Sequence, residues 1–130
     1  MTAVTKSGDD TSAEALGSAG LGLFAGSVER FPRTLKDASG VPLKVPHMGW
    51  NQLEPAWESP LLAGVETGDY TYFVHSYYCD PADATAVLAW TDYGFPFASV
   101  VQKDNVYGLQ FHPEKSQAVG LQILKNFLRI

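Results

Sequence analysis

The most informative segment of this chain reads Val106-Tyr107-Gly108-Leu109-Gln110-Phe111-His112-Pro113-Glu114-Lys115-Ser116. Its apolar first half predicts a buried strand. Side chains two residues apart on an extended segment point the same way, and the residue before a proline favours extended backbone. We therefore expect His112 and Glu114 to share one face. A carboxylate beside an imidazole fixes its tautomer and stabilises the imidazolium, so the pair suits a general base.

A general base of this kind needs a nucleophile to serve. The sequence contains one cysteine, Cys79, within His75-Ser76-Tyr77-Tyr78-Cys79-Asp80-Pro81. A nucleophile on a strained strand-to-helix elbow usually has small neighbours, whereas Tyr78 before it and Asp-Pro after it indicate a strand entering a turn. We interpret Cys79 as an ordinary reduced thiol. A relocated nucleophile at Cys79 is the alternative.

Size and composition narrow the function classes. With 130 residues, 45% hydrophobic and 18% charged, the chain is expected to form at most one compact domain. A net charge of −5 and the lack of a Lys/Arg cluster argue against nucleic-acid binding. One cysteine excludes an internal disulfide framework. No signal peptide or bilayer-spanning run is indicated, so we expect a cytoplasmic protein without membrane contact.

The order of predicted elements is many strands followed by one helix. Residues 1–19 are small and polar and are expected to be a loose segment, whereas residues 20–130 carry the domain. The helix is predicted from an N-cap at Ser116 through an apolar stripe, formed by Val119, Ile123, Leu124, Phe127, Leu128 and Ile130. Strands are predicted at Ser27–Phe31, Val41–Trp50, Tyr70–Tyr78, Ala84–Thr91, Ala98–Gln102 and Val106–Phe111, the last two joined by a turn at 103–105.

This arrangement is lopsided for an α/β fold. Val106–Phe111 and Tyr72–Val74 have the apolar character of strands buried on both faces, yet one helix covers only one face of a sheet. Either a partner covers the second face or an amino-terminal half of the fold is absent.

Three segments together resemble the class I glutamine amidotransferase family. They are Val45-Pro-His-Met-Gly-Trp-Asn-Gln-Leu53, Tyr72-Phe-Val-His-Ser-Tyr77 and Gly108-Leu-Gln-Phe-His-Pro-Glu-Lys-Ser116. The first is typical of one branch of the family, the glutaminase subunits of imidazole glycerol phosphate synthase, which serve histidine biosynthesis. The resemblance implies the carboxy-terminal part of a class I amidotransferase domain: a mixed sheet with an antiparallel portion and a carboxy-terminal helix.

The resemblance also implies roles for individual residues. His112 would be the base that activates a cysteine thiolate, and Glu114 would orient His112. The thiolate would attack the amide carbon of glutamine, giving a glutamyl thioester and ammonia, and water would release glutamate. The backbone at Ser76 and Tyr77 matches the place where the family holds the amino-acid end of glutamine.

A further set of residues matches positions that, in this branch, contact a (β/α)8-barrel synthase subunit. The barrel takes ammonia through a shielded path and uses it in forming the imidazole ring. The matching residues are Pro46, His47, Met48, Trp50, Asn51, Tyr72 and Lys115.

The sequence departs from the family at its beginning. The family's nucleophile lies on a Gly-x-Cys-x-Gly elbow, and neither this elbow nor the upstream oxyanion-hole segment occurs here. Met1 stands close to where the family has a methionine after the elbow cysteine. We therefore expect a sequence truncated at its amino terminus, with no glutaminase activity of its own.

Simpler interpretations remain open beside these. His112 and Glu114 could be a structural ion pair, and Met48 and Trp50 could be core residues. His75 is expected to be a packed histidine, and the helix stripe to be core. The three histidines lack zinc-site spacing, so neither a metal nor another cofactor is expected. The alternative functions are a non-catalytic, partner-binding amidotransferase-like domain and a class I amidotransferase that serves another acceptor, such as chorismate or a purine.

Overall fold

The computed structural model describes residues 25–130, and within them the expected mixture of antiparallel sheet and carboxy-terminal helix is confirmed. The loose segment predicted for residues 1–19 and the first five residues of the domain predicted for 20–130 lie outside the described residues. The strands are β1 (Gly26–Arg30), β2 (His47–Gln52), β3 (Glu54–Pro55), β4 (Tyr70–His75), β5 (Tyr77–Pro81), β6 (Val87–Asp92), β7 (Pro96–Lys103) and β8 (Val106–Leu109). Three short 3₁₀ helices, η1 (Pro60–Leu62), η2 (Ala84–Ala86) and η3 (Pro113–Lys115), accompany the helix α2 (Gln117–Arg129).

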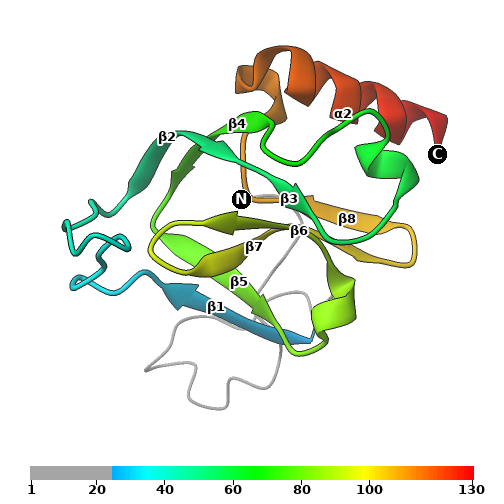
Figure 1. Ribbon diagram of the computed structural model, residues 1–130. Helices are drawn as coiled ribbons and strands as arrows, with labels where there is room; N and C mark the ends of the chain where they lie inside the picture. Colours follow the sequence, from blue (N-terminus) through cyan, green and yellow to red (C-terminus); the bar gives the residue numbers. More distant parts are fainter. Residues whose placement is uncertain (1–24) are drawn as a thin grey trace.

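The strands of residues 25–130 form two antiparallel sheets (Figure 1). The larger has the order β1-β5-β7-β6-β3, and β8 also pairs with β7, whereas β2 and β4 form a separate two-stranded sheet. Strand β7 organises the larger sheet because β6 pairs with it along its length, β5 pairs with it at Ala98, and β8 pairs with it from Val100 onward. Helix α2 lies on the side of β4, and β1 lies at the opposite side.

The predicted hairpin around residues 103–105 is confirmed. Strand β8 returns antiparallel to β7, with Lys103 opposite Val106. Asp104 has a φ of 53°, a left-handed conformation that Asp tolerates in tight turns. Strand β8 ends at Leu109, and the chain then runs to His112.

The prediction of one strand over Tyr70–Tyr78 is wrong in one respect: the segment forms two strands, β4 and the start of β5. The chain leaves the two-stranded sheet after His75 and enters the larger sheet at Tyr77. The cause is not local: the Ser76 carbonyl accepts a hydrogen bond from the Phe31 N–H (3.0 Å), and β5 then pairs with β1. We call Ser76 and Tyr77 the corner segment.

Two other strand predictions need correction at their starts. The strand predicted over Val41–Trp50 begins only at His47 and continues to Gln52. The strand predicted over Ala84–Thr91 opens with η2, because the Asp83 carboxylate accepts the Thr85 N–H (2.9 Å) and closes a helical turn.

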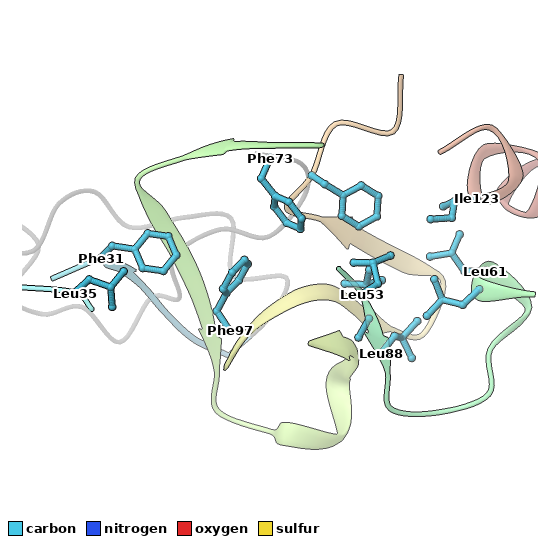
Figure 2. Close-up of a cluster of buried hydrophobic side chains, with 12 residues drawn as sticks. Phe31, Leu35, Leu53, Leu61, Phe73, Leu88, Phe97 and Ile123 are labelled. Carbon is cyan, nitrogen blue, oxygen red and sulfur yellow. The ribbon is translucent and has the colours of Figure 1, made fainter. Parts of the chain in front are cut away.

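The core lies between the two sheets and α2 (Figure 2). The rings of Phe31, Phe73 and Phe97 point toward one another, with Phe97 centroids 5.6 Å from Phe31 and 5.8 Å from Phe73. Toward the helix, Leu61 and Ile123 continue the same cluster.

Helix α2 buries less of its apolar stripe than predicted. Ile123 is 1% exposed and Val119 is half-buried, but Leu128 is 83% exposed. The described residues cover the helix only on its Ile123 side, where the Asn126 amide also donates to the Leu61 carbonyl (2.8 Å). The stripe residues that remain exposed are Leu124, Phe127, Leu128 and Ile130.

Val74 is 36% exposed and Tyr72 is half-buried, so one face of Tyr72–Val74 is open within the described residues. This agrees with the expectation that one helix covers only one face of these strands. No helix within residues 25–130 has both the length and the hydropathy needed to cross a membrane.

Candidate active site

His112 and Glu114 meet as predicted, although the backbone between them is not extended. The His112 Nδ1 and Glu114 Oε1 atoms are 3.0 Å apart. His112 is the N-cap of η3, so the chain turns through Pro113 and returns the Glu114 carboxylate to the imidazole. Proline suits the first position of such a helical turn as well as it suits extended backbone. The predicted pairing is confirmed, and the predicted extended geometry is wrong.

The partner of Nδ1 determines what the imidazole can do. An ionised carboxylate only accepts hydrogen bonds, so His112 Nδ1 carries the proton and donates it to Glu114. In the neutral ring Nε2 then holds the free lone pair, which is the state required of a general base. The side chains are 37% and 59% exposed, so the pair contributes little to stability and remains accessible to a reacting group.

The backbone of His112 is fixed to β4 through Ser116, a residue that is 1% exposed. The His112 N–H donates to the Tyr72 carbonyl (2.9 Å), and the Ser116 hydroxyl donates to the His112 carbonyl (2.7 Å). The same hydroxyl accepts the Tyr72 N–H (3.0 Å). Sequence reasoning assigned Ser116 as the N-cap of the helix; it occupies that position, but its side chain makes no capping bond.

Gly120 brings α2 against the turn that holds His112. A Cβ added at Gly120 would overlap the Pro113 carbonyl and lie 2.9 Å from Ser116 Cβ. Only glycine allows the first turn of the helix to pack this closely on η3. The predictions from sequence included no role for Gly120.

Cys79 does not supply a nucleophile in this arrangement. It is a free thiol on β5 that is 3% exposed. Burial raises the pKa of Cys79 to about 12, so the reactive thiolate is scarce at neutral pH. The interpretation of Cys79 as an ordinary reduced thiol agrees with this environment.

The corner segment connects the two sheets beside this site. Tyr77 is 52% exposed and Ser76 is half-buried. His75 Nδ1 lies 2.7 Å from the Tyr77 carbonyl. Because a carbonyl oxygen can only accept, His75 Nδ1 is the donor. His75 is 9% exposed, as expected for a packed histidine.

The solvent side of the two-stranded sheet carries large apolar side chains, which we call the outer face. Strand register places Met48 opposite Val74 and Trp50 opposite Tyr72. Met48 is 61% exposed and Trp50 is 46% exposed, and the Trp50 and Tyr72 rings meet edge to face at 5.7 Å. The outer face comprises Met48, Trp50, Tyr70, Tyr72 and Val74. Sequence reasoning missed Tyr70 and Val74, which the cross-strand pairing of two separate motifs would have indicated.

The other residues predicted at a partner contact have different positions. Lys115 Nζ lies 6.0 Å from the Tyr72 ring centroid, at the edge of the outer face. Pro46 is exposed and Asn51 is half-buried. His47, which was also predicted there, is 3% exposed and lies on the buried side of β2.

No group of three or more potential metal ligands occurs in the part of the chain from residue 25 onward. Among the described residues, the candidate site brings together the His112 imidazole, the Glu114 carboxylate and the backbone that holds them. Residues 14–130 match the family described as glutamine amidotransferase class-I.

The chain belongs to the class I glutamine amidotransferase family.

Three relatives within this family are named imidazole glycerol phosphate synthase subunit HisH. That of Methylococcus capsulatus is 54% identical over 110 residues, covering 84% of this chain and 51% of the relative. That of Geobacillus thermodenitrificans is 54% identical over 111 residues, covering 85% and 51%. That of Syntrophotalea carbinolica is 53% identical over 108 residues, covering 83% and 52%. This amidotransferase chain thus spans about half the length of the curated relatives it matches.

Proposed function

We propose that this amidotransferase chain carries the base half of the glutaminase site of imidazole glycerol phosphate synthase. The whole protein would hydrolyse glutamine to glutamate and ammonia for histidine biosynthesis. The observation that carries the proposal is the contact of 3.0 Å between His112 Nδ1 and Glu114 Oε1, which leaves Nε2 as the proton acceptor. The names and identities of the relatives support the choice of this branch of the family.

In the proposed reaction His112 Nε2 takes the proton of a cysteine thiol. The thiolate sulfur attacks the amide carbon of glutamine, the C–N bond breaks, and the imidazolium returns its proton to the departing nitrogen as ammonia forms. The same imidazole then deprotonates a water molecule that attacks the glutamyl thioester, which releases glutamate and restores the thiol. Glu114 holds the tautomer and stabilises the imidazolium in both halves.

The nucleophilic thiol is proposed to come from a segment beyond these 130 residues. Cys79 is the one cysteine of the sequence, and it is buried with a pKa raised to about 12. The 130-residue chain by itself is accordingly expected to lack glutaminase activity. Its single cysteine also fits a reducing, cytoplasmic location.

The corner segment and the outer face receive the two other proposed roles. Ser76 and Tyr77 would hold the amino-acid end of glutamine. The outer face, together with Pro46, Asn51 and Lys115, would dock a (β/α)8-barrel synthase subunit. Shielded transfer to this partner is chemically necessary, because ammonia that reaches water at neutral pH becomes ammonium, which is not a nucleophile.

The decisive experiment is to replace His112 by Asn in the complete glutaminase bound to its barrel partner. His112→Asn is expected to lower kcat for glutamate release by about 10³-fold or more, because the thiol loses its base. Cys79→Ser is the matched control and should retain the wild-type kcat. Full activity of His112→Asn, or loss of activity in Cys79→Ser alone, contradicts the assignment.

Docking is tested separately by two tryptophan variants measured by titration calorimetry against the barrel subunit. Trp50→Ala removes the largest ring of the outer face and is expected to weaken binding by about 30-fold, as for a central aromatic contact. Trp57→Ala is the control, because Trp57 is similarly exposed (53%) but follows β3, a strand of the larger sheet. Equal affinities of the two variants would contradict docking through the outer face.

A non-catalytic docking domain is the second candidate, and the burial of the chain's one cysteine favours it. A verified full-length protein that binds the barrel but releases no glutamate would establish this candidate and exclude the first.

A further inference from the structure

Two buried imidazoles do not belong to the His112–Glu114 pair. His47 and His75 face each other across the paired strands β2 and β4, and His47 Nδ1 lies 2.9 Å from His75 Nε2. They are 3% and 9% exposed. Aromatic rings enclose them: Tyr93 stacks on His47 at 3.9 Å and Phe97 lies 5.1 Å from His75. Buried polar groups need hydrogen-bond partners, and this pair supplies its own.

The proton positions in the pair follow from one end of the hydrogen-bond chain. The Tyr77 carbonyl can only accept, so His75 Nδ1 (2.7 Å away) carries a proton. Nε2 of the neutral His75 ring is then an acceptor, and His47 Nδ1 must donate to it. His47 Nε2 is left as an acceptor in its turn.

Asn51 is the first donor in this series of hydrogen bonds. Its Oδ1 accepts the Gln52 N–H (2.7 Å), which orients the amide. Its Nδ2 therefore has two hydrogens to donate, one to the Asp92 carbonyl (2.8 Å) and one to His47 Nε2 (3.2 Å). Every donor from Asn51 to Tyr77 thus has one acceptor, and all the bonds run in the same direction.

This series of hydrogen bonds requires both imidazole rings to be uncharged, and their pKa values show that they are. Burial and, to a lesser extent, the neighbouring His75 together lower the pKa of His47 to about 3. Burial also lowers the pKa of His75 to about 4, against the hydrogen bond to Tyr77 and with a smaller lowering from His112. The hydrogen-bonded residues and the proposed catalytic base are both attached to β4, because His75 lies on this strand and the carbonyl of its Tyr72 accepts the His112 N–H at 2.9 Å.

The series of hydrogen bonds ends at the corner segment. Both backbone carbonyls of that segment accept a hydrogen bond. His75 holds the Tyr77 carbonyl, and the Phe31 N–H holds the Ser76 carbonyl at 3.0 Å. We propose that Asn51, His47 and His75 form a directional hydrogen-bonded relay that positions the corner segment for glutamine binding. They are positioning residues and do not touch the reacting atoms. This inference rests on the proposed function, because the role of Ser76 and Tyr77 belongs to it.

The kinetic test uses the complete glutaminase with its barrel partner. His75→Phe keeps a ring in the aromatic enclosure but removes both relay bonds, and it is expected to raise the KM for glutamine about tenfold with a smaller change in kcat. His75→Asn places an amide nitrogen where Nδ1 was and should lower KM again by restoring the bond to the Tyr77 carbonyl. Tyr93→Phe is the matched control: it keeps the ring on His47, loses only the hydroxyl bond to the Lys44 carbonyl (2.6 Å), and should leave KM unchanged.

The outcomes separate this proposal from the proposed function. An inactive wild-type protein contradicts the proposed function. An active wild-type protein with an unchanged KM in His75→Phe, or with an equal rise in Tyr93→Phe, overturns the relay alone.

A spectroscopic test requires no variant to fold. Long-range ¹H–¹⁵N spectra of the wild-type protein at pH 7 should show both His47 and His75 neutral with the proton on Nδ1. An Nε2–H tautomer or an imidazolium at either residue overturns the relay even in an active enzyme.

Discussion

The Ser116 hydroxyl fixes the backbone that carries the His112 side chain. It donates to the His112 carbonyl at 2.7 Å and accepts the Tyr72 N–H at 3.0 Å, in a position that is 1% exposed. Ser116→Ala leaves the part-buried Tyr72 N–H without this partner, which costs about 1–3 kcal/mol of unfolding free energy. Denaturant unfolding measures the loss. Ser39→Ala, at an exposed site, is the control and should change stability by less than about 0.5 kcal/mol. Equal stability of the two variants would show that the Ser116 bonds are dispensable.

At the same scale, the pairing of His112 with Glu114 could be predicted from the sequence, but the hydrogen bonds of Ser116 that fix the His112 backbone could not. Two residues of separation bring the side chains together either along an extended chain or around a 3₁₀ turn, so the pairing was predicted although the backbone was not. Ser116 meets Tyr72, which is 44 positions earlier in the chain. A contact at that separation depends on how β4 and η3 pack, and no local pattern reports it.

At the scale of elements, Gly120 determines how closely α2 approaches η3. Replacing an interior helical glycine by alanine ordinarily stabilises a helix by about 1 kcal/mol. Gly120→Ala is expected to do the opposite and to destabilise by about 1–3 kcal/mol, because its Cβ would overlap the Pro113 carbonyl. Ala118→Gly, at an exposed position of the same helix, is the control and should cost about 1 kcal/mol through propensity alone. Thermal unfolding compares the two, and a gain in stability for Gly120→Ala would contradict the close packing.

Elements set by neighbouring residues were predictable, and those set by distant partners were not. The β7–β8 hairpin follows from turn residues and flanking apolar strands, and α2 follows from its apolar spacing. The division of the predicted strand at Ser76 depends on Phe31, whose N–H donates to the Ser76 carbonyl where the chain enters the larger sheet. The exposure of Leu128 likewise depends on what packs beside the helix, because its spacing alone resembled that of a buried residue.

At the scale of the whole molecule, the two sheets enclose an uncharged histidine pair whose protonation is linked to folding. The pKa values of His47 and His75 are lowered to about 3 and about 4, chiefly by burial. In the unfolded chain each imidazole returns to a pKa near 6.5 and binds a proton that the folded state excludes. The unfolded state then holds more protons, so the free energy of unfolding falls as the pH falls from about 6.5 toward about 4.

This linkage gives a prediction with a defined slope. Between pH 6 and pH 5 each buried imidazole should remove roughly 1 kcal/mol of stability per pH unit, and the pair about twice that. Denaturant unfolding at a series of pH values measures the slope. His47→Phe removes one of the two titrating groups while keeping a ring among Phe73, Tyr93 and Phe97, so its slope should be shallower by about one imidazole's share. A slope unchanged from wild type would mean that His47 is protonated to the same extent in both states, which the enclosed, uncharged pair does not permit.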